Sequence, residues 1–149
     1  MTAQSAHQPL LAVRDLSVKF ADSTAVKDVS FTLERGETMA LVGESGSGKS
    51  VTALSILQLL PYPRASHPSG SIIFDGQEMV GAKERKLRKI RGNRISMIFQ
   101  EPMTSLNPLH NIEKQVGEVL LLHKGLRGAK ARARILELLE LVGIPDPAS

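Results

Sequence analysis

The clearest chemical pattern in the chain is the stretch Gly43 to Ser50, which reads Gly-Glu-Ser-Gly-Ser-Gly-Lys-Ser. It fits G-x-x-x-x-G-K-[ST], in which glycines let the backbone bend so that consecutive N–H groups point at a phosphate. Lys49 is then expected to reach the β- and γ-phosphates, and Ser50 to offer its hydroxyl to Mg²⁺. The pattern predicts a loop that binds a triphosphate.

Such a loop needs a strand before it and a helix after it. The apolar run from Thr38 to Val42 predicts a short buried strand, and Val51 to Leu60 predicts a helix. The helix would add the positive end of its dipole to the phosphate site. A chance match in a Gly/Ser-rich turn is the alternative, and the predicted setting of strand, loop and helix disfavours it.

Length and composition narrow the class of protein. The chain has 149 residues, of which 42% are hydrophobic and 23% charged, as in an ordinary globular domain. Aromatic residues make up 3%, too few for a reader of single-stranded nucleic acid that stacks bases, so we expect a nucleotide and no nucleic acid as the partner. Residues 1–9 lack the features of a secretory signal, and no run could cross a bilayer, which predicts a cytoplasmic chain.

The segments around the loop predict a hairpin and a further strand. Leu10 to Phe20 and Ala25 to Leu33 read as two strands joined by the turn-prone residues 21–24. Ser71 to Phe74 reads as another strand, closed by the turn signal Asp75-Gly76. An aliphatic strand ending in Asp could instead hold Mg²⁺, but it follows the loop too closely and glycine stands where a catalytic Glu is usual, so we prefer the hairpin.

A basic segment precedes the next predicted strand. Its cationic residues could bind nucleic acid or an anionic membrane, but Leu87 and Ile90 form the narrow apolar stripe of a helix lying on a core, so we favour a solvated helix. They are Lys83, Arg85, Lys86, Arg88, Lys89, Arg91 and Arg94. Arg94 to Phe99 then alternates as a strand would, and Gln100 follows it at the carboxyl end, where ligands bind in open α/β sheets.

Two helices are predicted in the last part of the chain. Their apolar positions recur with helical spacing at Ile112, Val116, Val119 and Leu120, and at Ile135, Leu138, Leu139 and Val142. Gly143 and Pro145 are expected to end the second helix. The four histidines, His7, His67, His110 and His123, have no metal-ligand spacing.

With these segments in order, the chain resembles the ATP-binding subunits of ABC transporters, in the importer group that serves dipeptides, oligopeptides and nickel. The most selective segment is Phe-Gln-Glu-Pro-Met-Thr-Ser-Leu-Asn-Pro at 99–108, supported by Leu16 to Phe20, Val42 to Val51, Gly70 to Ile72 and Leu138 to Pro145. Asn107 to His110 and the basic helix look closest to the microcin C type of peptide importer.

The resemblance implies a role for each matched residue. Phe20 falls where the family stacks an aromatic ring on adenine, although that residue is usually Tyr. Gln100 matches the family's glutamine that contacts Mg²⁺ and the attacking water, so Ser50 and Gln100 are the expected metal contacts and Gln100 and Lys49 the expected catalytic residues. The expected nucleotide-binding set is Phe20, Val26, Gly43, Ser45, Gly46, Ser47, Gly48, Lys49, Ser50 and Val51, where Val51 replaces a frequent Thr.

The resemblance also implies a fold and an organisation. We expect an incomplete α/β protein: a P-loop NTPase core of the RecA-like kind, with an N-terminal antiparallel β subdomain and the start of an α-helical subdomain. The expected divisions are a disordered tail at 1–9, the nucleotide-binding core at 10–110 and the start of the helical subdomain at 111–149.

The implied activity is ATP binding and hydrolysis coupled to uptake of peptides or related solutes. The implied cofactors are ATP and Mg²⁺, and the implied partners are membrane permease subunits, a second ATP-binding subunit facing it head to tail, and indirectly a periplasmic solute-binding protein. Such a subunit would lie at the cytoplasmic face of the inner membrane.

Some segments of the family's pattern are missing from the sequence. Nothing resembles the Leu-Ser-Gly-Gly signature, the aliphatic strand ending Asp-Glu or the switch His, so we expect an N-terminal part of an importer ATPase that binds ATP and does not turn it over alone. Two alternatives remain: a small-molecule kinase with the same kind of loop, and a non-catalytic piece that docks on a membrane subunit.

Overall fold

The computed structural model describes residues 7–100 and 106–148 of the chain. These residues form two compact units, which divide between Arg88 and Lys89. Each unit is described by itself below. The boundaries predicted at 9/10 and 110/111 mark functional divisions and stay predictions.

The first unit is built on an antiparallel sheet. Its order is β2 (Ser23–Leu33), β1 (Leu11–Phe20), β4 (Ser71–Phe74) and β5 (Gln77–Glu78), and β3 (Ala65–Ser66) also pairs with β1. The predicted hairpin is confirmed, since β1 and β2 pair antiparallel from Leu11 with Leu33 to Phe20 with Ser23. The register shifts between Val13 and Leu16, between Leu16 and Val18 and between Val18 and Lys19, and β1 buries two runs of residues, at 11–13 and 16–18.

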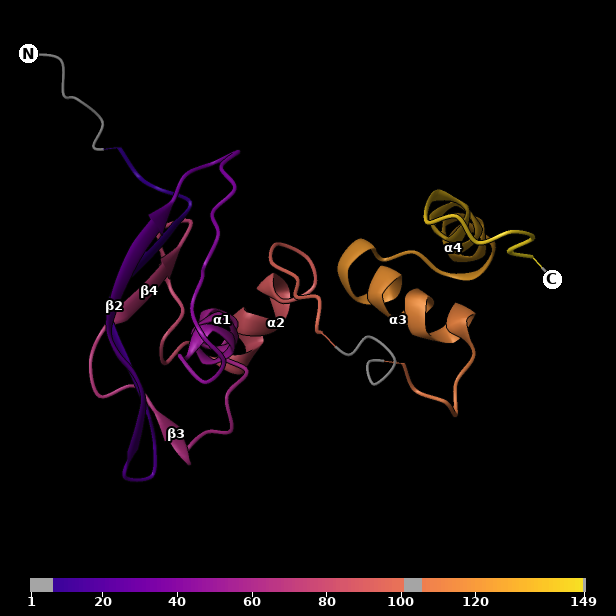
Figure 1. Ribbon diagram of the computed structural model, residues 1–149. Coiled ribbons are helices and arrows are strands. Elements are labelled where there is room, and N and C mark those ends of the chain that lie inside the picture. Colours follow the sequence, from indigo (N-terminus) through magenta and orange to yellow (C-terminus); the bar gives the residue numbers. More distant parts are fainter. Residues whose placement is uncertain (1–6, 101–105, 149) are drawn as a thin grey trace, which may run out of the picture. The chain divides into compact units, whose positions relative to one another are not determined.

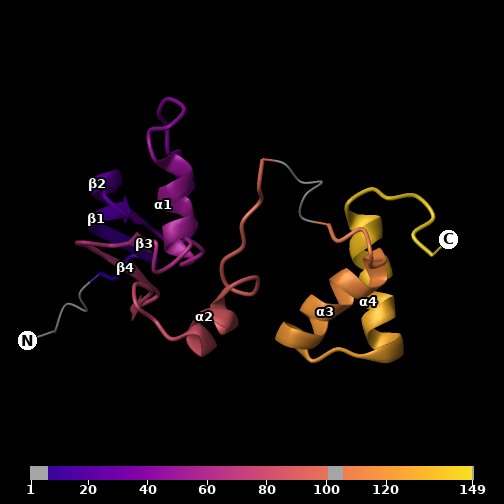
Figure 2. The ribbon, with the colours of Figure 1, turned by 90° about the horizontal axis from the view of Figure 1, so that it is seen from below.

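The core of this unit lies between the sheet and one helix. Helix α1 (Lys49–Ile56) runs along one side of the sheet, as Figure 1 and the turned view of Figure 2 show. The fully buried side chains of Val13, Leu16, Val18 and Ile72 come from β1 and β4. Leu57, directly after α1, is also buried. The predicted helix at 51–60 is therefore present but begins and ends earlier.

The strand that ends at Asp75 forms a hairpin, as predicted. Phe74 pairs with Gln77, and Asp75 has a positive φ of 47° in the connecting turn. The carboxylate of Asp75 accepts a hydrogen bond from the Arg35 guanidinium at 2.5 Å. Asp75 is thus a turn residue in an antiparallel hairpin, which agrees with rejecting it as a metal ligand.

The prediction of a buried strand at Thr38 to Val42 is wrong for this structure. These residues carry no regular structure, and Val42 is 84% exposed. A strand forms only where its backbone N–H and C=O groups pair with a neighbour. No strand within 7–100 and 106–148 pairs with this segment, so the apolar sequence stays extended and uncovered.

The strand predicted at Arg94 to Phe99 is also absent. The segment follows helix α2 (Glu84–Ile90) and has a single isolated bridge, between Arg91 and Ile95. Ile98 is 93% exposed and Phe99 47%. As for residues 38–42, this segment joins no sheet within the described part of the chain, which explains why it does not form a strand. In α2, burial of Leu87 and Ile90 confirms the predicted apolar stripe.

The second unit contains a pair of helices, α3 (Ile112–Lys124) and α4 (Gly128–Leu141). They lie against one another in Figure 1 and Figure 2, and both were predicted from their spacing. Leu120 of α3 and Ala131 and Ile135 of α4 are the buried apolar residues of this pair. The Asn111 side chain caps α3 by accepting a hydrogen bond from the Lys114 N–H at 2.8 Å. No helix in the described part of the chain is long and apolar enough to cross a bilayer.

Two truncations of aliphatic side chains should distinguish the packed strand β1 from the uncovered residues 38–42. Leu16→Ala removes a fully buried side chain and should lower the free energy of unfolding by about 2–5 kcal/mol. Val42→Ala removes an exposed one and should change it by less than about 0.5 kcal/mol. Urea denaturation followed by circular dichroism measures both. A loss at Val42 as large as that at Leu16 would show that residues 38–42 are packed in solution.

Candidate functional site

The predicted phosphate loop connects the extended segment before it to α1. Residues 45–46 form a turn in which the Ser47 N–H donates to the Glu44 carbonyl at 3.1 Å. Gly48 follows in the left-handed conformation, with φ of 95°, and is the N-cap of α1. The Thr52 N–H and hydroxyl both donate to the Gly48 carbonyl, at 2.9 and 2.8 Å. The loop therefore passes into the helix with its first turn already closed.

The loop is seated on strand β2 through Gly48. A Cβ at this position would lie 2.9 Å from the Ala25 carbonyl oxygen and 2.9 Å from Cγ2 of Val26. Val26 is 4% exposed and pairs with Val18 of β1. Glycine is thus required twice, by the positive φ and by the contact with β2. Val26 is expected in the nucleotide-binding set. In the structure its side chain lies against Gly48 and supports the loop.

Lys49 folds back onto the loop. Its Nζ donates to the carbonyl oxygen of Gly43 and, at 3.0 Å, to that of Glu44. The ammonium group therefore lies at the start of the loop, held by backbone dipoles. An anion placed there would compete with these carbonyls for the same cation.

Ser50, Val51 and Phe20 are further expected nucleotide contacts in the first unit. Ser50 lies exposed in the first turn of α1, and Val51 beside it is half-buried. Phe20 is half-buried at the end of β1, where its backbone pairs with Ser23 and Ala65. Gln100, exposed in a bend, belongs to the second unit, so its approach to the phosphates remains a prediction.

Comparison with known proteins gives the family. A sequence profile described as ABC transporter matches residues 26–149, which include the loop and most of the chain. The chain belongs to the ABC transporter family. The membership of this family that the sequence motifs predict is confirmed.

Relatives and solved structures agree with this assignment. The peptidoglycan transport ATP-binding protein YejF of Agrobacterium fabrum is 67% identical over 144 residues, covering 94% of this chain and 26% of YejF. The oligopeptide transport ATP-binding protein OppD of Bacillus subtilis is 47% identical, covering 93% of this chain and 40% of OppD. The structure of cbiO1 from Clostridium perfringens, part of the cbiONQ complex, matches with a TM-score of 0.67 and 25% identity over 93% of this chain and 52% of that chain.

These alignments also set the extent of the match. The chain spans about a quarter of the length of YejF and two fifths of OppD. The P-loop α/β fold of an ABC ATPase is therefore shown for this chain, whereas the activity of a whole transporter subunit is a matter for the proposal below.

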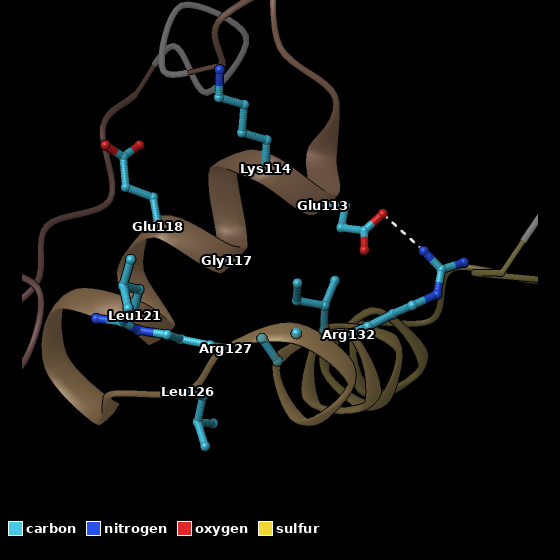
Figure 3. A pocket seen from close by; sticks show the side chains of 11 residues that line it. Glu113, Lys114, Gly117, Glu118, Leu121, Leu126, Arg127 and Arg132 are labelled. Carbon is cyan, nitrogen blue, oxygen red and sulfur yellow. Dashed lines mark hydrogen bonds and ion pairs between the residues drawn. The ribbon is translucent and has the colours of Figure 1, made fainter.

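The second unit of this ABC chain has a groove of about 480 Å³ between α3 and α4 (Figure 3). Leu121, Leu126 and Ile135 supply its apolar lining. An ion pair at its edge joins Glu113 of α3 to Arg132 of α4 at 2.8 Å and is drawn as the dashed line in Figure 3. Both side chains are about half exposed, so this pair fixes geometry more than it adds stability.

A polar cluster around His67 lines another cavity, of about 450 Å³, in the first unit. The Ser17 carbonyl can only accept, so Nδ1 of His67 carries the proton in this 3.3 Å contact. Nε2 then accepts from the Tyr62 hydroxyl at 2.5 Å and from the Gln58 amide at 3.3 Å. This neutral tautomer satisfies all three partners, and sequence spacing gave no signal for the cluster. Glu84 lines the same cavity.

Burial lowers the pKa of His67 below its ordinary value near 6.5, and the hydrogen bond to the Ser17 carbonyl opposes this shift in part. The contribution of His67 to stability should therefore be complete above about pH 6.5. It should be lost as the pH falls from that value to the folded-state pKa, because the unfolded chain takes up the proton first.

Unfolding free energies measured by urea titration between pH 5 and 8 test this dependence. His67→Gln should flatten the slope below about pH 6.5, whereas His123→Gln should keep it. A slope that is unchanged in His67→Gln would contradict the assignment.

Proposed function

We propose that this chain is the part of an ABC importer ATPase that binds the phosphates of ATP, in a subunit that drives uptake of peptides or related solutes. The observation that carries the proposal is the loop from Gly43 to Ser50, seated on β2 and continued into α1. The match of this chain to the ABC transporter family over residues 26–149 supports ATP as the nucleotide.

The residues present suit a triphosphate and its metal ion. The loop's backbone N–H groups and the amino end of α1 favour negative charge. Within the described residues Lys49 bonds to neutral carbonyls of the loop, and it can exchange them for the stronger charge-assisted bonds to β- and γ-phosphate oxygens. Ser50 is an exposed residue, and its hydroxyl is a suitable ligand for Mg²⁺, which prefers oxygen and would neutralise phosphate charge.

The remaining contacts are assigned to the adenine ring and to the attacking water. Phe20 would stack on adenine, with Val26 and Val51 supporting the loop beside it. The backbone groups of Ser45, Gly46 and Ser47 would complete the cradle. Gln100 would contact Mg²⁺ and orient the attacking water, and the general base would come from outside residues 1–149. Hydrolysis thus needs groups that this chain does not supply by itself.

The proposed assembly follows from the relatives. Proteins named as oligopeptide and dipeptide transport ATP-binding proteins are 47% and 49% identical to this chain. We therefore propose permease subunits and a second ATP-binding subunit as partners, at the cytoplasmic face of the inner membrane. A periplasmic binding protein would deliver the solute, for which a peptide or a peptide-containing compound of the microcin C type is proposed.

Nucleotide binding is tested by the melting temperature of the purified chain. MgATP should raise it in a concentration-dependent way, since a ligand at one hundred times its dissociation constant adds about 2.7 kcal/mol to the free energy of unfolding. Lys49→Ala should abolish the shift, because the phosphates lose the cation of the loop. Lys83→Ala removes an exposed lysine far from the loop in sequence and should leave the shift unchanged.

Two outcomes would contradict the proposal. An equal shift in wild type and Lys49→Ala would mean that ATP binds elsewhere, and no shift at all would favour a piece that docks without nucleotide. A phosphate-release assay completes the test, with no steady turnover expected from the isolated chain.

A further inference from the structure

The net positive charge of the chain is concentrated in the segment from Lys83 to Arg94. Its twelve residues include seven Lys or Arg and one acid, Glu84, which gives a net charge of +6. The rest of the chain has twelve Lys or Arg and fourteen Asp or Glu, which gives −2. The phosphate loop, with one Lys and one Glu, does not account for the excess in this segment.

Helix α2 has one apolar face and one basic face. Leu87 and Ile90 are 4% and 6% exposed and form the buried face. Arg85 and Lys89 are four residues apart, so they lie on the same side of the helix, opposite this apolar stripe, and both are exposed. Lys86 is exposed as well. The helix is therefore buried along one side and presents cations to solvent along the other.

The acid of the helix does little to neutralise this face. Nε of Arg88 lies 3.9 Å from Oε1 of Glu84, one turn earlier. Their side chains are 73% and 59% exposed, and ion pairs at such exposed positions contribute little. The charges of Arg85, Lys86 and Lys89 come in addition to this pair.

We propose that the basic face of α2, formed by Arg85, Lys86 and Lys89 with Lys83 directly before the helix, binds the anionic headgroups of a lipid bilayer. Clusters of four to eight Lys and Arg on one helix are typical of such binding, because each cation is attracted to the negative surface. The choice of a bilayer over another polyanion rests on the proposed function, which places the subunit at the cytoplasmic face of the membrane.

The burial of Leu87 and Ile90 determines the kind of contact. A helix that enters a bilayer places its apolar side chains among the acyl chains, whereas those of α2 are already covered by protein. The basic face can thus lie on the headgroups and is held there by charge alone. Each Lys or Arg then raises the partition constant about fivefold. The attraction should weaken with salt, since the Debye length falls from about 10 Å at 0.1 M to about 3 Å at 1 M.

Co-sedimentation of the whole chain with lipid vesicles tests the contact. Vesicles of equal parts phosphatidylglycerol and phosphatidylcholine should bind the chain at low salt, and vesicles of phosphatidylcholine alone should not. The partition constant should fall about fivefold for each single replacement and about 100-fold for the triple variant Arg85→Gln, Lys86→Gln and Lys89→Gln. Equal sedimentation of wild type and this triple variant, or binding that persists in about 1 M salt, would overturn the proposal.

A matched control separates the site from net charge. The chain has a second basic stretch at residues 124–134, where Arg132 pairs with Glu113 at 2.8 Å and Arg134 with Glu137 at 2.9 Å. Its other three cations are exposed, and a second triple variant removes them: Lys124→Gln, Arg127→Gln and Lys130→Gln. This variant has the same net charge as the first and should keep most of the binding. Equal losses in the two triple variants would mean that binding follows net charge, which would overturn the site.

A charge-retaining variant guards against loss of folding. Arg85→Lys, Lys86→Arg and Lys89→Arg together keep all three charges and should bind the anionic vesicles as wild type does. Loss of binding in this variant, with the far-UV circular dichroism of wild type, would contradict a contact made by charge. If the Gln triple variant is unfolded, the single replacements decide the proposal.

Duplex DNA offers the same phosphodiester charge and is the competing partner. A headgroup layer is flat and can meet every exposed cation of a face, whereas α2, about 10 Å long, would meet few phosphates of a duplex. A gel-shift assay at the same salt and phosphate concentration should therefore show weaker binding to DNA than to vesicles. Tighter binding to DNA that is lost in the Gln triple variant would assign the face to nucleic acid and overturn the lipid contact.

Failure of the proposed function gives a separate result. The Gln triple variant leaves Gly43 to Ser50 intact and should keep the shift in melting temperature with MgATP. If wild type shows no such shift, ATP binding is refuted, and sedimentation still decides whether the basic face binds lipid. If wild type binds ATP and does not sediment with anionic vesicles, the lipid contact alone is overturned.

Discussion

The hydrogen bonding of β1 on both of its edges is the constraint on which the first unit depends. One edge pairs with β2 along the whole strand, and the other pairs with β4 at Leu11 to Arg14 and with β3 at Lys19 and Phe20. Between β4 and β3, the Ser17 N–H donates to the Ser69 carbonyl at 3.1 Å. The Ser17 hydroxyl also accepts from the Asp28 N–H of β2 at 3.2 Å, so this serine joins three segments. A buried central strand of this kind fixes β2, and β2 in turn fixes the loop through Val26 and Gly48.

How well the sequence predicted each element follows from where its partners lie. The hairpin of β1 and β2, the turn at Asp75 and the helices α3 and α4 depend on local turn signals and on periodicity, and all of these agree with the structure. Residues 38–42 and 94–99 carry equally good strand patterns but join no sheet within the described part of the chain, where Ile95 has only an isolated bridge to Arg91. A parallel strand depends on distant segments, so its pattern alone could not establish it.

The candidate site shows the same division between local and distant information. The motif at Gly43 to Ser50 predicted a bent, glycine-rich loop that leads into a helix, because both depend on the conformation of a few adjacent residues. It gave no sign that Lys49 would bond to the carbonyls of Gly43 and Glu44, or that Val26 would lie against Gly48. Contacts between side chain and backbone across such distances are decided by the fold, and a single sequence does not encode them in any fixed spacing.

In the second unit, the small core gives the side-chain hydrogen bonds more weight. Three apolar residues of the helix pair are buried, Leu120, Ala131 and Ile135, while Leu122 stays 67% exposed. The close approach of the helices at Gly117, where an added Cβ would lie 3.6 Å from Cδ1 of Ile135, brings little further apolar surface out of water.

Isolated helices of this length are marginal in water, so their ends fray unless capped. The Asn111 cap and the hydrogen bonds of the Gln115 side chain with the backbone of Asn107 and His110 act at the same end of α3, and they hold the entering chain where burial does not. An end of a helix that is held by a few exposed hydrogen bonds opens at a smaller cost in free energy than one that is held by a core.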